Sequence, residues 1–242
     1  MKSIISAFLR WHRSRDLWRR VDNEVQRALA LQQENFPRSI KLPRDYGKAL
    51  PERVVELLIA SVSTKGRSKV LDVGFANATP SQLRLMDRLP KTLSFTGIDI
   101  APPSQEVKRR YNETILGDVV TAEIPRGTFD LIWCISCIEH LGRDNSAYCQ
   151  EFRIQRDMDR KALRALWEAL KDGGLLLVTA PFGRFEDHGW QVNYDDATWW
   201  ALLDEAAGKA LRTEIFFRHT FGGGVVPGGS GGIEAHGLLR PG

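Results

Sequence analysis

The sequence predicts a doubly wound α/β domain with a mostly parallel, seven-stranded sheet and a helical extension at its N-terminus. Short apolar segments alternate with helical ones from Lys69 onward, which is the pattern of a parallel sheet joined by crossover helices. A length of 242 residues suits one such domain with a few additions rather than two separate cores. The apolar fraction of 43% and charged fraction of 26% exclude a disordered chain and a disulfide scaffold.

Two segments with different patterns make up the chain. We expect a helical extension over residues 1–48 and the main domain over residues 49–242. Apolar residues recur near a 3.6 spacing over residues 1–35 and predict a helix that the following prolines end. Pro51 suits the first turn of a second helix, which runs through Val62.

Seven apolar segments of the main domain predict strands. They are residues 70–74, 94–100, 114–118, 129–136 and 175–180, followed by 213–217 and 233–239. The fourth segment is apolar almost throughout, which is typical of a strand buried on both faces of a parallel sheet. The last two predict an antiparallel hairpin, and the glycine-rich stretch 222–232 is interpreted as a flexible loop.

Helical signals separate these strands. Thr79 is placed to cap a helix whose first turn holds Pro80, and Gln82 completes a capping box. A helix over about residues 158–170 is expected to stop at the glycine pair that follows it. Another helix is expected around residues 196–207.

The net charge of +4 and the pI near 9.0 reflect a basic first stretch of the chain. Such an arm suits phosphate, an acidic glycan or an anionic membrane, and it equally suits a lid, a dimer contact or a solvated helix face. No apolar run reaches the roughly 18 to 20 residues that span a bilayer. The short apolar start lacks a cleavage site before Arg10, and 3 cysteines are too few for a disulfide framework. We therefore expect a cytoplasmic protein.

Three aspartates mark the ends of the first three strands. Asp72 precedes Gly74, Asp99 lies near the end of the second strand, and Asp118 closes the third. Ionised carboxylates accept hydrogen bonds from ribose hydroxyls and from an exocyclic amine, and a glycine turn lets a ligand approach the backbone closely. Because ligands of such sheets bind beyond the carboxyl ends of the strands, these residues predict a nucleoside-binding site.

Five stretches in this order resemble the class I S-adenosylmethionine-dependent methyltransferase family, over roughly residues 50–220. They are Val-Leu-Asp-Val-Gly-Phe-Ala-Asn-Ala (70–78), Phe-Thr-Gly-Ile-Asp-Ile (95–100), Gly-Asp-Val (117–119), Phe-Asp-Leu-Ile-Trp-Cys-Ile-Ser-Cys-Ile-Glu-His-Leu-Gly (129–142) and Leu-Lys-Asp-Gly-Gly-Leu-Leu-Leu-Val-Thr-Ala-Pro-Phe-Gly (170–183). The resemblance implies a Rossmann-like methyltransferase fold, S-adenosylmethionine as the cofactor and methyl transfer as the reaction.

The resemblance also implies roles for individual residues. It places Asp72 and Gly74 at the methionine end of the cofactor and Asp99 on the ribose hydroxyls. It places Asp118 near the adenine amine, with Val119 beside it. The remaining residues that it assigns to the cofactor are Ala76, Asn77, Ile100, Cys134 and Ser136, the last two beside the sulfonium.

The turn after the first strand departs from the family pattern. The family commonly has glycine at the positions of Ala76 and Ala78. Alanine is small enough to keep a close approach to the ligand but disfavours a positive φ. The same substitutions argue against a dinucleotide-binding site, which requires G-x-G-x-x-G.

Methyl transfer from a sulfonium is an in-line displacement, so the protein must align two reactants and remove a proton from a hydroxyl acceptor. His140 is the candidate base, because imidazole titrates near neutrality and this residue follows the fourth strand. Glu139 is placed to orient His140 or to touch the cofactor. The alternative is that His140 only packs against or caps the next segment.

A second polar and aromatic cluster follows the fifth strand. Its candidate acceptor-binding residues are Glu186, His188, Trp190 and Tyr194. Rings beside carboxylates suit a polar acceptor such as a sugar, whereas the alternative is a solvated loop with Trp190 covering the core. No ligand spacing supports a metal site, and none is predicted.

The leading hypothesis is an O- or N-methyltransferase that acts on a small-molecule or saccharide-like acceptor in a secondary-metabolite or glycan pathway. An RNA methyltransferase is a second hypothesis, although the Asn/Asp-Pro-Pro-aromatic motif of amino-directed base methylation is absent after the fourth strand. A non-catalytic partner protein is the third, because fold alone does not give function. A homodimer and a peripheral membrane contact are both compatible with the N-terminal extension.

Overall fold

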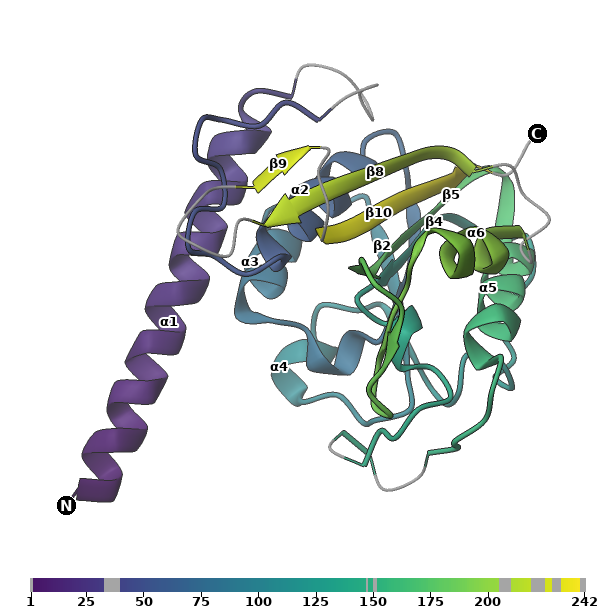
Figure 1. Cartoon of the computed structure of the whole chain (residues 1–242), viewed down its shortest axis with the longest axis horizontal. Coiled ribbons are helices and arrows are strands. Elements are labelled where there is room, and N and C mark those ends of the chain that lie inside the picture. The colour runs from purple at the N-terminus through teal and green to yellow at the C-terminus, as the bar shows by residue number, and fades with distance from the viewer. Residues whose placement is uncertain are drawn as a thin grey trace.

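The computed structural model describes residues 2–32, 40–146, 148–149, 152–204, 210–218, 225–227 and 232–239. Its centre is an eight-stranded sheet in the order β3-β2-β1-β4-β5-β10-β8-β9 (Figure 1). The strands are β1 (Lys69–Val73), β2 (Ser94–Asp99), β3 (Glu113–Leu116), β4 (Phe129–Ile135), β5 (Leu170–Phe182), β8 (Ala210–Arg218), β9 (Val225–Pro227) and β10 (Gly232–Leu239). A separate two-stranded ribbon pairs β6 (Glu186–Asp187) with β7 (Val192–Asn193).

The direction of the strands follows the prediction. Strands β1 to β5 are parallel, and β10 runs antiparallel between β5 and β8. The sheet has eight strands rather than seven because β9, inside the stretch that we interpreted as a loop, pairs with β8. The chain order reverses between β1 and β4, which is the switch point where ligands of such sheets bind.

Helices cover both faces of the sheet. They are α1 (Lys2–Leu29), α2 (Arg53–Ser63), α3 (Pro80–Arg88), α4 (Gln105–Lys108), α5 (Met158–Ala169) and α6 (Asp196–Asp204), with short 3-10 turns η1 (Phe75–Asn77) and η2 (Ile138–His140). The two hydrophobic clusters place α1, α2 and α3 on one face and α5 and α6 on the other. None of the described helices is long and apolar enough to cross a membrane.

Strand β4 shows how one apolar segment serves both cores. Leu131 and Trp133 belong to the cluster beneath α2 and α3, whereas Ile132 and Cys134 belong to the cluster beneath α5 and α6. Successive side chains of a strand point to opposite faces, so a strand covered on both faces is apolar throughout. The continuous apolar pattern of the sequence has this cause.

One predicted helix end and one predicted stop signal differ from the structure, although α5 itself lies within one residue of its predicted bounds. Helix α5 ends at Ala169, and Leu170 already begins β5. The glycines at 173 and 174 therefore do not stop the helix as predicted but lie within β5, where Gly173 has φ +73°. The N-terminal helix ends at Leu29, before the predicted residue 35.

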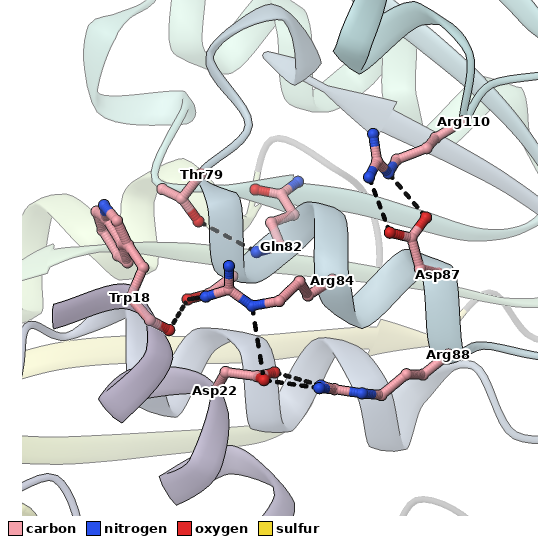
Figure 2. A network of polar contacts seen from close by, with 9 residues as sticks. Trp18, Asp22, Thr79, Gln82, Arg84, Asp87, Arg88 and Arg110 are labelled. Atoms are coloured by element: carbon pink, nitrogen blue, oxygen red, sulfur yellow. Dashed lines mark hydrogen bonds and ion pairs between the residues drawn. The ribbon is translucent and has the colours of Figure 1, made fainter. Parts of the chain in front are cut away.

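Helix α1 is anchored to α3 at its C-terminal half, and its N-terminal end extends beyond the rest of the molecule (Figure 1). Val21, Val25 and Ala28 are buried in the shared core. Figure 2 shows the polar part of the contact, in which Asp22 accepts hydrogen bonds from both terminal nitrogens of Arg88. The anchored part of the predicted extension thus contributes to the core of the main domain.

Candidate active site

A cavity of about 1400 Å³ opens at the carboxyl edge of β1, β2 and β4, at the switch point of the sheet. It exceeds the roughly 300 to 1,000 Å³ of a typical single-ligand pocket, so it has room for a cofactor and an acceptor together. Of the residues predicted from the sequence, its lining includes Asp72, Gly74, Asn77, Asp99, Ile100, Asp118, Val119, Ser136, Glu139 and His140. The structure thus brings most of the predicted cofactor residues together.

The turn after β1 requires glycine at its first position. Gly74 has φ +80°, a left-handed conformation that favours glycine. A Cβ atom at this position would lie 2.9 Å from Sγ of Cys137, which also lines the cavity. The turn therefore exposes bare backbone at the floor of the cavity, which suits the close approach of a ligand.

Asp99 is held in place by the backbone of two neighbouring segments. Its Oδ2 accepts a hydrogen bond from the amide of Ala76 at 2.8 Å, and its Oδ1 accepts one from the amide of Ala101 at 2.9 Å. Burial raises the pKa of Asp99, and these backbone hydrogen bonds oppose the rise. Each carboxylate oxygen keeps a further lone pair, so the fixed carboxylate is able to accept two ribose hydroxyls. Ala76 itself is not in the lining and acts through its amide.

Asp72 belongs to a buried polar triad. Its Oδ2 accepts hydrogen bonds from the hydroxyl of Tyr111 at 2.6 Å and from Nε2 of Gln82 at 3.1 Å. Burial raises the pKa of Asp72 to about 7, against the effect of these hydrogen bonds. The predicted cap of α3 is confirmed for Thr79, whose hydroxyl accepts from the amide of Gln82. The side chain of Gln82, however, turns to Asp72, so the predicted capping box is only half formed.

The adenine end of the predicted site lies after β3. Asp118 is half-buried, and its Oδ1 accepts a hydrogen bond from the amide of Val120 at 2.8 Å. Val119 beside it is buried and also lines the cavity. An oriented carboxylate next to an apolar side chain suits an amine on a flat ring.

The end of β4 departs from the expectation for two residues. Cys134 is fully buried in the core and is not among the cavity residues, because strand alternation directs it toward α5. Ser136 lines the cavity, but its hydroxyl donates to Oε1 of Glu56 at 2.5 Å. Its backbone, with φ +45°, therefore forms the cavity wall while its hydroxyl is already engaged.

His140 has a defined hydrogen-bond partner and a lowered basicity. Its Nδ1 lies 2.9 Å from the main-chain oxygen of Trp190, and the two rings stack with centroids 5.5 Å apart. Burial lowers the pKa of His140, and the bond to Trp190 opposes this. A carbonyl oxygen only accepts, so Nδ1 carries the proton and Nε2 is unprotonated in the neutral ring. His140 is therefore neutral at physiological pH with a free basic nitrogen.

Glu139 lines the cavity with a side chain that is 2% exposed. Burial raises its pKa to about 8, so the carboxyl is mostly protonated at neutral pH. Its Oε1 lies 3.8 Å from Nε2 of His140, and its Oε2 has no hydrogen-bond partner among the described residues. Buried polar atoms normally have a hydrogen-bond partner, so the unpartnered oxygen of this lining residue marks a position where a partner is missing.

The second predicted cluster does not line this cavity. Glu186 and His188 form an exposed pair on the β6-β7 ribbon, 3.5 Å apart. Tyr194 is buried and donates its hydroxyl to Asp159 at 2.9 Å. Trp190 reaches the site only through its stacking on His140, and none of these four residues is in the lining. Within the described part of the chain, no group of three or more metal-binding side chains is arranged around a common point.

Several polar residues that line the cavity were not predicted from the sequence, among them Arg53 and Gln82. Both lie in the first turn of a helix, α2 and α3 respectively. Helices of this fold run antiparallel to the strands they cover, so their N-termini lie at the ligand-binding edge. That rule, applied to each predicted helix, is the signal that points to them.

Comparison with known proteins agrees with this geometry. Residues 17–216 match a family model described as a methyltransferase domain. One similar structure is the 1,6-didemethyltoxoflavin-N1-methyltransferase from Burkholderia thailandensis, solved with 1,6-didemethyltoxoflavin and S-adenosylhomocysteine bound. It is 14% identical to this chain with a TM-score of 0.53, and the match covers 77% of this chain and 79% of that one. A S-adenosylmethionine-dependent methyltransferase from Archaeoglobus fulgidus is 12% identical with a TM-score of 0.53, over 79% and 96%.

A third similar structure is the [4+2]-cyclase SpnF, which is 15% identical with a TM-score of 0.52, over 78% of this chain and 81% of that one. At these identities the structures show the fold alone, and no curated protein sequence matches the chain. The family model covers most of the chain. The glycine turn at Gly74 and the oriented carboxylate of Asp99, both in the cavity lining, fit a nucleoside cofactor. The chain belongs to the methyltransferase-domain family and is a class I, S-adenosylmethionine-dependent methyltransferase.

Proposed function

We propose that the protein methylates a hydroxyl or amine of a small-molecule or saccharide-like acceptor that enters the cavity beside His140. The observation that carries the proposal is the pair of contacts at His140. Its Nδ1 is engaged by the main chain of Trp190, while the ring lines a cavity large enough for two ligands. This arrangement presents a neutral base where an acceptor has room to bind.

The site geometry and the family support an assignment of the cofactor residues. We assign Asp72 and Gly74 to the methionine portion, Asp99 to the ribose hydroxyls, and Asp118 with Val119 to the adenine. S-adenosylmethionine supplies an electrophilic methyl group on a sulfonium when it is bound. The contribution of the chain is to hold that group in line with the acceptor and to exclude water.

His140 removes the acceptor proton. Its Nε2 is the unprotonated nitrogen, and its lowered pKa keeps it unprotonated at neutral pH. Glu139, mostly protonated at that pH, is able to donate a hydrogen bond from its carboxyl to an acceptor oxygen. The two side chains thus present one proton acceptor and one donor to the same end of the cavity.

The shape of the site favours a small acceptor. Tyr148 packs edge-on against His140, and Phe152 and Met158 add apolar and aromatic lining elsewhere in the cavity, as in sites that enclose small molecules. The Glu186 and His188 pair that suggested a sugar lies outside the lining, so a saccharide acceptor depends on contacts at the cavity mouth.

Calorimetric titration with S-adenosylmethionine and S-adenosylhomocysteine is the first test. We expect binding by the intact chain, loss of at least tenfold in affinity for Asp99→Ala, and unchanged affinity for the exposed control Glu106→Ala. A screen of hydroxylated and aminated metabolites, glycosides and RNA, read out as S-adenosylhomocysteine release, then identifies the acceptor. Absence of cofactor binding by a folded sample contradicts the proposal, and turnover only with RNA contradicts the acceptor class.

A further inference from the structure

A buried carboxylate in the first turn of helix α2 connects three elements around the cavity. Glu56 is 0% exposed. Its Oε1 accepts hydrogen bonds from the hydroxyls of Ser136, at 2.5 Å, and Thr179, at 2.7 Å. Its Oε2 lies 3.1 Å from Nη1 of Arg53, an ion-pair contact without hydrogen-bond geometry. Helix α2, the end of β4 and strand β5 therefore meet at one carboxylate.

Burying the carboxylate of Glu56 lowers the stability of the fold unless its contacts compensate for the lost hydration. A carboxylate without exposure loses its hydration, and an apolar side chain of similar size in an otherwise apolar helix often gives equal or greater stability. The neighbours of Glu56 on α2, such as Leu57 and Val55, are apolar and buried. The structure thus places a charge where packing alone would favour a hydrocarbon.

Arg53 is the ion-pair partner of Glu56 and is part of the cavity lining. Its side chain is 21% exposed and lines the cavity, and it makes no hydrogen bond with any residue that the structure describes. Burial raises the pKa of both Asp72 and Glu139, and the positive charge of Arg53 opposes the rise in both. Arg53 is therefore a cation among the carboxyls at the methionine end, with most of its donors unused.

The turn that follows β4 at Ser136 has a strained backbone, which is held by hydrogen bonds to neighbouring segments. Ser136 has φ +45°, a left-handed conformation uncommon for a residue other than glycine. Its amide donates to both the carbonyl and the hydroxyl oxygen of Thr179, at 3.1 and 2.9 Å, while its own hydroxyl donates to Glu56. Strained residues of this kind persist where their surroundings hold them. The turn leads directly to Glu139 and His140.

We propose that Arg53 binds the α-carboxylate of the methionine portion of S-adenosylmethionine, and that Glu56 is a positioning residue that orients Arg53 and holds the Ser136 turn. The inference rests on the proposed function, because it assigns a contact to the same cofactor. The chemistry is direct. A zwitterionic amino acid needs a cation for its carboxylate, and a guanidinium binds a carboxylate with two parallel hydrogen bonds.

The test compares two ligands that differ in the carboxylate. S-adenosylhomocysteine carries the amino-acid portion, whereas 5′-methylthioadenosine has the same nucleoside thioether without it. We expect Arg53→Met to weaken S-adenosylhomocysteine binding tenfold or more, about 1.4 kcal/mol, and to leave 5′-methylthioadenosine binding within twofold. The exposed control Arg126→Met is expected to change neither affinity.

Glu56→Gln separates the two roles of the carboxylate. Its amide oxygen still accepts from Ser136 and Thr179, but its neutral side chain no longer attracts Arg53. We therefore expect this variant to fold and to show the same ligand selectivity as Arg53→Met with a smaller loss, and Arg53→Lys to recover part of the affinity.

Equal losses for both ligands, or no loss for either, overturn the inference. If the unmodified chain binds neither ligand, the proposed function fails instead. Circular dichroism and thermal melts of each variant distinguish a lost contact from a lost fold.

Discussion

The main-chain oxygen of Trp190 lies 2.9 Å from Nδ1 of His140, between residues 50 positions apart in the chain. The contact defines the tautomer of the imidazole, because a carbonyl accepts a hydrogen bond and cannot donate one. It also orients the ring, which stacks on Trp190. The basic nitrogen of His140 is thus determined by a backbone atom of a distant loop.

Replacing His140 tests the proposed base. We expect His140→Ala to lower kcat by about 10² to 10⁴, the usual contribution of a general base, with unchanged affinity for S-adenosylhomocysteine. In the intact enzyme kcat should rise with pH through a pKa below 6.5 and then level, because only neutral imidazole accepts a proton. The rate of methyl transfer to the identified acceptor between pH 5 and 9 measures both effects.

Trp190→Phe is the matched control for this prediction. It keeps the backbone carbonyl and an aromatic ring for stacking, so kcat should change little. A loss as large as that of His140→Ala would show that the indole, rather than the imidazole, performs the essential task.

The stability of the ligand-free protein should fall as pH rises. Asp72 and Glu139 have pKa values raised by burial to about 7 and about 8, above those of the unfolded chain. Between the unfolded and folded pKa values the folded state binds more protons, so each rise in pH favours unfolding. We expect the free energy of unfolding, from urea titrations, to decrease between about pH 6.5 and pH 8, above the range in which the lowered pKa of His140 has the opposite effect.

Glu139→Gln should flatten the upper part of this decrease, since a neutral amide replaces the group that ionises last. Added S-adenosylmethionine should oppose the decrease as well, because its positive charges favour the ionised form of Asp72. A stability that is independent of pH over this range in the unmodified chain would contradict the prediction.

Two glycines offer a controlled test of the turn at the cavity floor. Gly74 and Gly66 have similar φ values, +80° and +74°, but a Cβ at Gly74 meets Cys137 whereas one at Gly66 meets nothing within 4 Å. Gly66→Ala should cost only the left-handed backbone strain, about 1 to 2 kcal/mol. Gly74→Ala should cost more and also weaken cofactor binding. Equal unfolding free energies for the two variants would show that the contact with Cys137 is unimportant.

Asp22 pairs α1 with two arginines of α3, Arg84 and Arg88 (Figure 2). Its side chain is 8% exposed and pairs with Arg88, whereas Asp16 pairs with Arg19 on the exposed surface, at 52% exposure. Asp22→Asn should destabilise the protein by about 1 to 2 kcal/mol, since Arg88 is half-exposed. Asp16→Asn should cost less than about 1 kcal/mol. Chemical denaturation of both variants measures the difference, and equal values would assign the attachment to apolar packing alone.

The N-terminal arrangement shows one limit of sequence reasoning. The helical spacing predicted α1, yet nothing in that spacing shows that Asp22 meets residues of α3 more than sixty positions away. Glu56 shows another limit. In the sequence it is one acidic residue in an amphipathic pattern, and ordinary patterns place such a residue on the solvent side.

Local chemistry and strand periodicity were enough to predict the five parallel strands, the antiparallel tail and a polar site marked by the aspartates at the ends of the first three strands. The reason is that parallel strands must be apolar and must end at one edge, so polar residues at those ends are marked in the sequence itself. The glycine at position 74 is marked in the same way, because a left-handed turn excludes most other residues.

Only the tertiary structure decided which polar side chains share a cavity. Arg53 and Gln82 line the cavity, whereas Cys134 lies in the core and Glu186 and His188 lie outside the lining. The hydroxyl of Ser136 donates to Glu56 rather than facing a ligand. The tertiary structure also selected the basic nitrogen of His140 through Trp190. These outcomes depend on contacts between segments far apart in the chain, and such contacts leave no periodic signal in either segment alone.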